Sequence, residues 1–179
     1  MKKLKNTLKI CVLILVGAAV LSGCKKSATD PDAALKASIQ KYVINSTAST
    51  EADLIAEWLD TMRKNQENLQ TTSTGINYIP IKTGEGATVK AGDSLTVKYV
   101  GFFMNGSILD ASDYHGGTFK YVHKTDSMIK GWEEGIEVLN KGASAVFLIP
   151  SAKGYGTTGH GPVAPNTPLI FVIEVVDIK

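Results

Sequence analysis

The first amphipathic pattern after the N-terminal segment lies between residues 31 and 44. Large apolar side chains recur there at the three- and four-residue spacing that places them on one helix face. They are Leu35, Ile39, Tyr42 and Val43. Asp30 is a candidate N-cap and Pro31 suits the first helical position, so the pattern predicts a helix that ends near Ile44.

A second stripe with the same period follows a turn-rich break at residues 45–49. Its apolar positions are Leu54, Ile55, Trp58, Leu59 and Met62. Thr50 and Asp53 have the spacing of a capping box, so we predict a helix from this point to about Asn65. Both stripes suit packing against the main domain or against each other, and a homodimer through these helices is the alternative.

From Gly75 onward the period shortens to two, and β-branched and aromatic residues become frequent. The alternation over residues 95–100 predicts a half-buried strand. Asn105-Gly106 is a strong hairpin signal because both residues tolerate positive φ. A return strand is therefore expected to start at Ile108.

One helix interrupts the strands of this half. Apolar residues have helical spacing over residues 128–139, and Gly142 follows where a helix would stop. Residues 146–149 form an apolar run and residues 169–175 alternate, which predicts two more strands. The chain is thus predicted to be an α+β protein, an antiparallel sheet crossed by one short helix and preceded by two N-terminal helices.

The N-terminal segment resembles an export signal, because basic residues precede an apolar stretch that is too short to span a bilayer. The stretch ends in Leu21-Ser22-Gly23-Cys24, which resembles the bacterial lipobox, where the cysteine is acylated and becomes the first mature residue. A plain secretory signal or an N-terminal anchor helix is the alternative. The predicted organisation is a lipoprotein signal peptide at residues 1–23, a polar tether at 24–30, a helical N-terminal extension at 31–74 and the main domain at 75–179.

Charge and cysteine content exclude some classes of function. The chain has 19 Lys and Arg against 17 Asp and Glu, a net charge of +2. Cleavage of the signal removes four lysines and no acid, which leaves −2 and argues against a nucleic-acid partner. With Cys24 acylated and Cys11 removed, no thiol remains for a disulfide or for catalysis. The histidines have no metal-ligand spacing, so neither a metal nor a cofactor is predicted.

A series of motifs occurs in a fixed order in the main domain. They are Tyr99-Val100-Gly101, Asn105-Gly106, Asp110, Ile129-Lys130-Gly131-Trp132-Glu133-Glu134-Gly135, Gly154-Tyr155-Gly156, Gly159-His160, Pro165 and Leu169-Ile170-Phe171. Together these motifs resemble the FKBP-type peptidyl-prolyl cis-trans isomerases over about residues 75–179. The resemblance implies a twisted antiparallel sheet wrapped around one short helix, with a pocket between them whose floor is Trp132.

The same resemblance implies which residues line this pocket. It assigns catalysis to Tyr99, Asp110, Trp132, Tyr155 and Phe171, and substrate binding to Leu109, Phe119, Met128, Ile129, His160 and Val163. Asp110 is expected to bond the Tyr99 hydroxyl. The Ile129 N–H and the Tyr155 hydroxyl are expected to bond substrate carbonyls. His160 and Val163 are expected on the loop rim, and His160 without an acid–base role.

Three departures from the family pattern keep another function open. The family commonly has phenylalanine at the position of Leu109 and valine at that of Met128, and the loop after His160 is one residue shorter here. The alternative is a non-catalytic FKBP-like binding module or holdase chaperone. A structural lipoprotein subunit that dimerises through its N-terminal helices is a third class.

The signal and the resemblance together imply proline-containing exported polypeptides as substrates and the lipid bilayer as a partner through acylated Cys24. Lys25 follows this cysteine, where an aspartate would favour retention in the inner membrane. The expected location is therefore the bacterial cell envelope, lipid-anchored at the outer membrane and facing the periplasm or the cell surface.

Overall fold

The computed structural model describes residues 33–179, which belong to one compact unit, Pro31–Lys179. This unit contains both of the hydrophobic cores described below, so a chain that begins at Lys25 retains everything that the fold requires. The predicted signal peptide, the tether and Cys24 lie outside the described residues. Within residues 33–179, no helix is both long and apolar enough to cross a membrane.

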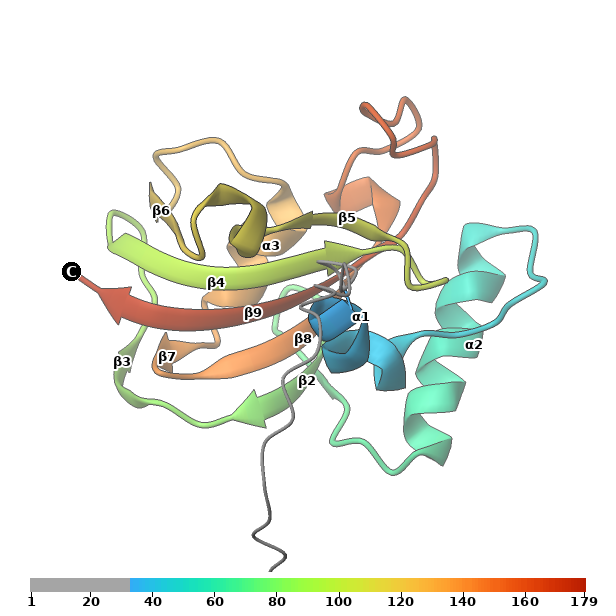
Figure 1. Ribbon diagram of the computed structural model, residues 1–179, viewed down its shortest axis with the longest axis horizontal. Coiled ribbons are helices and arrows are strands. Elements are labelled where there is room, and N and C mark those ends of the chain that lie inside the picture. Colours follow the sequence, from blue (N-terminus) through green and yellow to red (C-terminus); the bar gives the residue numbers. More distant parts are fainter. Residues whose placement is uncertain (1–32) are drawn as a thin grey trace, which may run out of the picture. The chain divides into compact units, whose positions relative to one another are not determined.

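A seven-stranded antiparallel sheet organises the unit, with the strand order β1-β2-β8-β9-β4-β5 and β6 paired to β4 (Figure 1). The strands are β1 Gln70–Thr71, β2 Asn77–Lys82, β4 Ser94–Phe102, β5 Ile108–Ala111, β6 Phe119–Val122, β8 Ser144–Ile149 and β9 Leu169–Ile178. A separate pair joins β3 Glu85–Thr88 to β7 Asn140–Lys141. Because β1 precedes Gly75, the sheet begins inside the predicted N-terminal extension.

Both faces of the sheet are buried, each in its own hydrophobic core. In β8, Phe147 and Ile149 belong to the core that contains Trp132, whereas Val146 and Leu148 belong to the core that contains the N-terminal helices. Successive side chains of a strand point to opposite faces, so a strand covered on both sides reads as a continuous apolar run. This explains why the residues of β8 that follow Ser144 form a continuous apolar run.

The helix of the main domain, α3 Lys130–Ile136, is shorter than the predicted range 128–139. Ile129 has extended backbone angles, φ −65° and ψ 141°, and caps the helix start. Leu139 lies beyond the helix end, where its carbonyl accepts a hydrogen bond from the Val89 N–H at 2.9 Å. Its side chain is nevertheless buried, so the apolar residue at this position indicated burial in the core and not a continued helix.

The N-terminal helices cover the other face of the sheet. The first, α1 Ala33–Ile39, continues as a 3-10 turn, η1 Gln40–Tyr42, and thus ends before the predicted Ile44. The second, α2 Glu51–Lys64, ends where expected, and Thr50 caps it by accepting the Asp53 N–H at 3.2 Å.

The apolar stripes of both helices pack against the sheet. Trp58 and Met62 are completely buried, and the Trp58 Nε1–H donates to the Tyr42 carbonyl at 2.8 Å. The same core includes Val146 and Ile170 from the sheet. The interpretation as packing against the main domain is confirmed. A homodimer through these helices stays a prediction, and it would have to use their exposed sides.

The predicted hairpin between β4 and β5 is present, although its turn differs from the expected one. Of the two turn residues, only Gly106 adopts a positive φ, of 84°. The Phe103 N–H donates to the Ser107 carbonyl at 2.9 Å, and the Gly106 N–H donates to the Phe103 carbonyl at 2.8 Å. The turn is therefore longer than a two-residue loop, and one glycine supplies the left-handed position.

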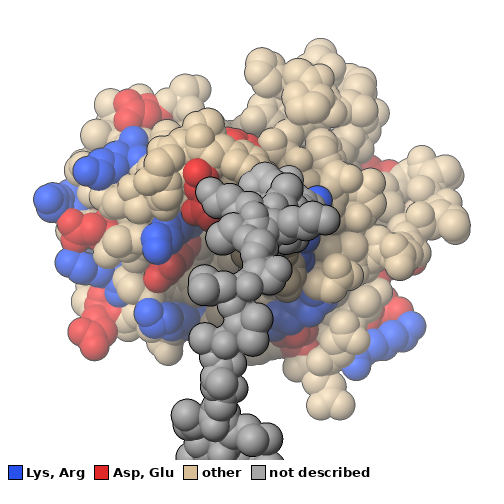
Figure 2. All heavy atoms as spheres, viewed as in Figure 1, with Lys and Arg blue, Asp and Glu red and all other residues tan. Residues whose placement is uncertain are grey.

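Charged side chains of both signs are mixed on the face of the molecule drawn in Figure 2. One ion pair joins Lys141 of β7 to Asp177 of β9, with Nζ and Oδ1 2.6 Å apart. Exposed pairs of this kind contribute little to stability, typically less than about 1 kcal/mol. The fold therefore depends on its two cores.

Candidate active site

A cavity of about 780 Å³ lies between the sheet and α3. It is lined by Tyr99, Leu109, Asp110, His115, Phe119, Ser127, Met128, Ile129, Lys130, Trp132, Gly154, Tyr155 and Phe171. Nine of the eleven residues that the sequence assigned to the pocket are therefore brought together, from six separate stretches of chain. The volume is that of a typical small-ligand or peptide pocket.

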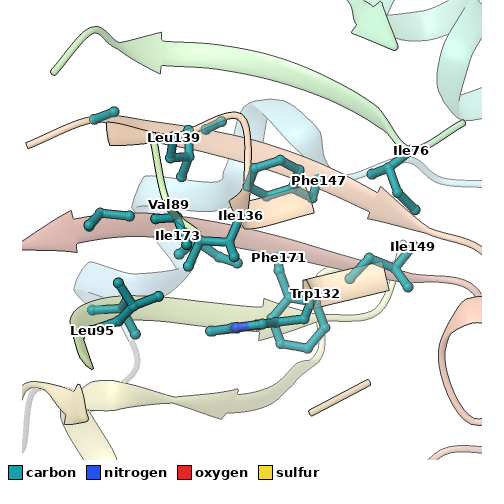
Figure 3. Packing of buried hydrophobic residues seen from close by; sticks show 14 of the residues in the cluster. Ile76, Val89, Leu95, Trp132, Ile136, Leu139, Phe147, Ile149, Phe171 and Ile173 are labelled. Carbon is teal, nitrogen blue, oxygen red and sulfur yellow. The ribbon is translucent and has the colours of Figure 1, made fainter. Parts of the chain in front are cut away.

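The Trp132 indole forms the floor of the cavity and is held from two sides. Its ring meets Tyr99 and Phe171 edge to face, with centroids 5.2 and 5.4 Å away and interplanar angles of 87° and 86°. Its Nε1–H donates to the Tyr121 hydroxyl at 2.8 Å, on the core side. Figure 3 shows Trp132 beside Phe171 among the buried residues of this core. The indole is thus fixed in one orientation and presents an apolar surface to the cavity.

The Phe171 wall depends on a glycine on the neighbouring strand. Gly101 pairs with Phe171 across β4 and β9, and a Cβ added to Gly101 would lie 2.4 Å from Cε1 of the phenyl ring. Any side chain there would push the ring out of its present position. This close approach explains in physical terms why the motif Tyr99-Val100-Gly101 ends in glycine.

Asp110 is the acceptor at the centre of a polar cluster on the cavity wall. Its Oδ2 accepts the Tyr99 hydroxyl at 2.6 Å, which confirms the predicted bond. Its Oδ1 accepts the Ala111 N–H at 2.9 Å and lies 2.8 Å from Nε2 of His115. Burial, followed by the bond to Asp110, raises the pKa of Tyr99 well above its usual value. The phenol therefore stays protonated and donates to the carboxylate at physiological pH.

His115 was missed as a site residue by the sequence reasoning, which considered it only as a metal ligand. It follows Asp110 by five residues on a 3-10 turn, η2 Ser112–His115, that folds the imidazole back toward the carboxylate. This turn has no strong sequence signature beyond Gly116, which adopts a positive φ of 88° directly after it. The position of His115 thus became evident only from the fold.

Two residues expected on the loop rim do not line the cavity. Val163 is only 4% exposed and packs into the core that contains Trp132. His160 and Val163 form an isolated β-bridge with two backbone hydrogen bonds of 2.9 Å each. His160 is exposed, and its imidazole ring stacks on the ring of Tyr155, with the two centroids 5.4 Å apart. The short loop folds Val163 inward, which corrects the predicted rim position.

The remaining predicted residues lie where a peptide could reach them. The carbonyl of Ile129 accepts from the N–H groups of Trp132 and Glu133, and its own N–H has no acceptor within residues 33–179. Leu109 and Met128, which replace the residues common in the family, both line the cavity with apolar side chains. No group of three His, Cys, Asp or Glu in the described part of the chain could hold a metal ion.

The comparisons with known proteins agree with this geometry. The family described as "FKBP-type peptidyl-prolyl cis-trans isomerase" matches residues 85–176. A probable FKBP-type peptidyl-prolyl cis-trans isomerase of Haemophilus influenzae is 36% identical over 114 residues, which cover 63% of this chain and 46% of the relative. The FKBP-type isomerase FkpA of Escherichia coli is 30% identical over 148 residues, covering 83% of this chain and 53% of its own length. The chain thus spans about half the length of these curated relatives.

A solved structure shares the fold. The crystal structure of a peptidyl-prolyl cis-trans isomerase from Pseudomonas syringae superposes with a TM-score of 0.60 at 30% sequence identity, and the match covers 75% of this chain and 99% of that one. The protein belongs to the FKBP-type peptidyl-prolyl cis-trans isomerase family.

Proposed function

We propose that this protein is an active peptidyl-prolyl cis-trans isomerase that acts on X-Pro segments of exported polypeptides. The observation that carries the proposal is the cavity floor, where Trp132 is held edge to face by Tyr99 and Phe171. The aromatic rings offer an apolar surface on which a proline ring can pack, in a cavity of about 780 Å³. The polar groups on its wall are then available for the peptide backbone on either side.

The chemistry needs no covalent step and no proton transfer. Rotation of an X-Pro bond breaks amide resonance and meets a barrier of roughly 20 kcal/mol. The twisted amide has less charge separation than the planar form, so a water-poor apolar slot favours the twisted form. Catalysis is then spread over shape and polarity, and it requires neither a nucleophile nor a metal ion.

Two hydrogen bonds to backbone carbonyls of the substrate would fix its orientation. The Ile129 N–H, which has no acceptor within the described residues, would donate to a carbonyl next to the proline. Tyr155 also lines the cavity, and its hydroxyl would donate to a second carbonyl. The carboxylate of Asp110, bonded to Tyr99, would supply a local field at the rotating amide.

A non-catalytic binding module or holdase chaperone is the second candidate. The specific observation in its favour is that Leu109 and Met128, which depart from the family pattern, both line the cavity. A reshaped slot could hold proline without favouring the twisted amide. The two candidates differ in turnover and not in binding.

The chain from Lys25 to Lys179 allows both candidates to be tested in one assay. We expect it to accelerate cis-to-trans conversion of a Leu-Pro tetrapeptide, and we expect the inhibitor rapamycin to abolish the acceleration, because both compete for the Trp132 floor. Stopped-flow kinetics with and without the inhibitor measures this. Inhibitor binding without acceleration would establish the binding module. Neither result in a folded sample would contradict the isomerase and the proline-binding module, and would leave the holdase chaperone.

The role of Asp110 predicts a defect in activity that is separate from stability. Asp110→Val should lower kcat/KM between about 10-fold and 1000-fold, because it removes the acceptor of the Tyr99 hydroxyl and the field at the amide. The free energy of unfolding, measured in urea, should change by no more than about 2 kcal/mol, since the Asp110 side chain is outside the packed core. Asp113→Val, on the 3-10 turn that directly follows β5, is the matched control and should keep normal kcat/KM. Full activity of folded Asp110→Val would refute the role.

We also propose that the mature protein is a lipoprotein of the cell envelope, anchored through Cys24 at the outer membrane. The sequence Leu21-Ser22-Gly23-Cys24 after a basic and apolar segment supports this proposal. An acyl anchor on the first mature residue would leave the site facing exported chains.

The anchor can be tested with the two cysteines of the chain. In a bacterial host fed with labelled palmitate, Cys24→Ser should abolish labelling and move the protein out of the membrane fraction. Cys11→Ser, in the predicted signal, is the control and should remain labelled and membrane-bound. Density-gradient separation of the membranes should place the labelled protein in the outer membrane. Labelling that persists in Cys24→Ser would rule out the proposed anchor.

A further inference from the structure

A glutamate from the N-terminal extension reaches the loop that carries Tyr155. Glu51 is the first residue of α2, and both of its carboxylate oxygens are used on a residue 100 positions later in the chain. Oε1 accepts the Ser151 N–H at 2.5 Å, and Oε2 accepts the Ser151 hydroxyl at 2.6 Å. Glu51 lies outside residues 85–176, the part that matches the family.

Ser151 in turn fixes the backbone on both sides of Tyr155. Its carbonyl accepts the N–H groups of Gly154 and Gly156, each at 2.8 Å. Ser151 is itself only 4% exposed, so water does not readily replace these partners. A continuous series of hydrogen bonds therefore runs from α2 through Ser151 to the two residues that flank Tyr155.

The glycines make this support important for the position of the tyrosine. Gly156 adopts a positive φ of 64°, which a residue with a side chain rarely adopts, and a second glycine, Gly154, precedes Tyr155. Glycines on both sides leave Tyr155 with little local restraint. The rigidity of the loop must then come from the hydrogen bonds that it makes to the rest of the structure.

A second contact holds the start of the same loop independently of Glu51. The Lys153 ammonium donates to the Thr74 carbonyl at 2.5 Å and to Oε2 of Glu134 at 2.6 Å. Burial alone would raise the pKa of Glu134, but the bonds from Lys153 and Thr74 outweigh it, so the pKa is lowered and the carboxylate stays charged. Loss of Glu51 should therefore loosen the loop without unfolding it.

We propose that Glu51 is a positioning residue that sets the Tyr155 hydroxyl for the substrate, so that the N-terminal extension is part of the functional site. The proposal rests on the proposed function for its effect on turnover, because Tyr155 is the group that would bond a substrate carbonyl. A misplacement of such a group by about 1 Å can cost on the order of 100-fold in rate. A loosened loop, which samples the right position part of the time, should cost less.

The test compares Glu51→Ala with Glu57→Ala in the chain from Lys25. Glu57 lies on the same helix, where its carboxylate accepts the Ser46 hydroxyl instead of a group of the Tyr155 loop, and it serves as the matched control. We expect Glu51→Ala to lower kcat/KM about 5- to 20-fold and to shift the amide NMR signals of Gly154, Tyr155 and Gly156. Glu57→Ala should change neither. Glu51→Gln, which keeps one carbonyl oxygen as acceptor, should recover at least half of the lost kcat/KM and keeps the test decisive if Glu51→Ala does not fold.

The Tyr155→Phe background shows whether Glu51 acts through the tyrosine. If it does, Glu51→Ala should lower kcat/KM less than twofold in a chain that already lacks the Tyr155 hydroxyl. An equal loss in both backgrounds, or unchanged amide signals at Gly154 and Gly156 in Glu51→Ala, would overturn the proposal. The amide signals need no turnover, so a wild-type chain without isomerase activity would refute the proposed function and leave the positioning by Glu51 measurable.

Discussion

The arrangement of this protein depends on the Trp132 indole, which is at once a core residue and the floor of the site. Only 2% of the residue is exposed, yet its ring supports the two aromatic walls, Tyr99 and Phe171. Its orientation is fixed by the hydrogen bond to the Tyr121 hydroxyl. Burial is the main reason that the pKa of Tyr121 is raised to about 12, so this hydroxyl stays neutral and can accept the indole N–H. Stability and substrate recognition therefore share one side chain.

The second constraint is that the sheet is covered on both faces. The core around Trp132 builds the cavity, and the core around Trp58 joins the N-terminal helices to the opposite face. The extension is consequently a structural part of the domain. Its contact with the Tyr155 loop through Glu51 and Ser151 gives it a place in the site as well. The region that matches the family supplies the aromatic pocket, and the rest of the chain supports it.

The sequence predicted the elements whose signals are local. Alternation predicted β4 and β9, and the capping spacing predicted the start of α2. The family resemblance carried by the ordered motifs implied the cavity floor and the Tyr99–Asp110 bond. What the sequence could not give depends on contacts between distant segments. The burial of Val163, the approach of His115 to Asp110 and the bond from Glu51 to Ser151 all require the folded chain. The apolar spacing also predicted a longer α3 than the structure has, because Leu139 is buried after the helix ends and so continues the helical spacing of apolar residues.

The most direct measurement compares Trp132→Ala with Trp58→Ala, each a fully packed tryptophan in a different core. Both substitutions should lower the free energy of unfolding by about 3 to 5 kcal/mol, because each leaves a large cavity. At a temperature where both variants are folded, only Trp132→Ala should also lose peptide binding and kcat/KM, since only its indole forms the floor of the site. A folded Trp132→Ala with normal kcat/KM, or an equal loss in Trp58→Ala, would contradict the account.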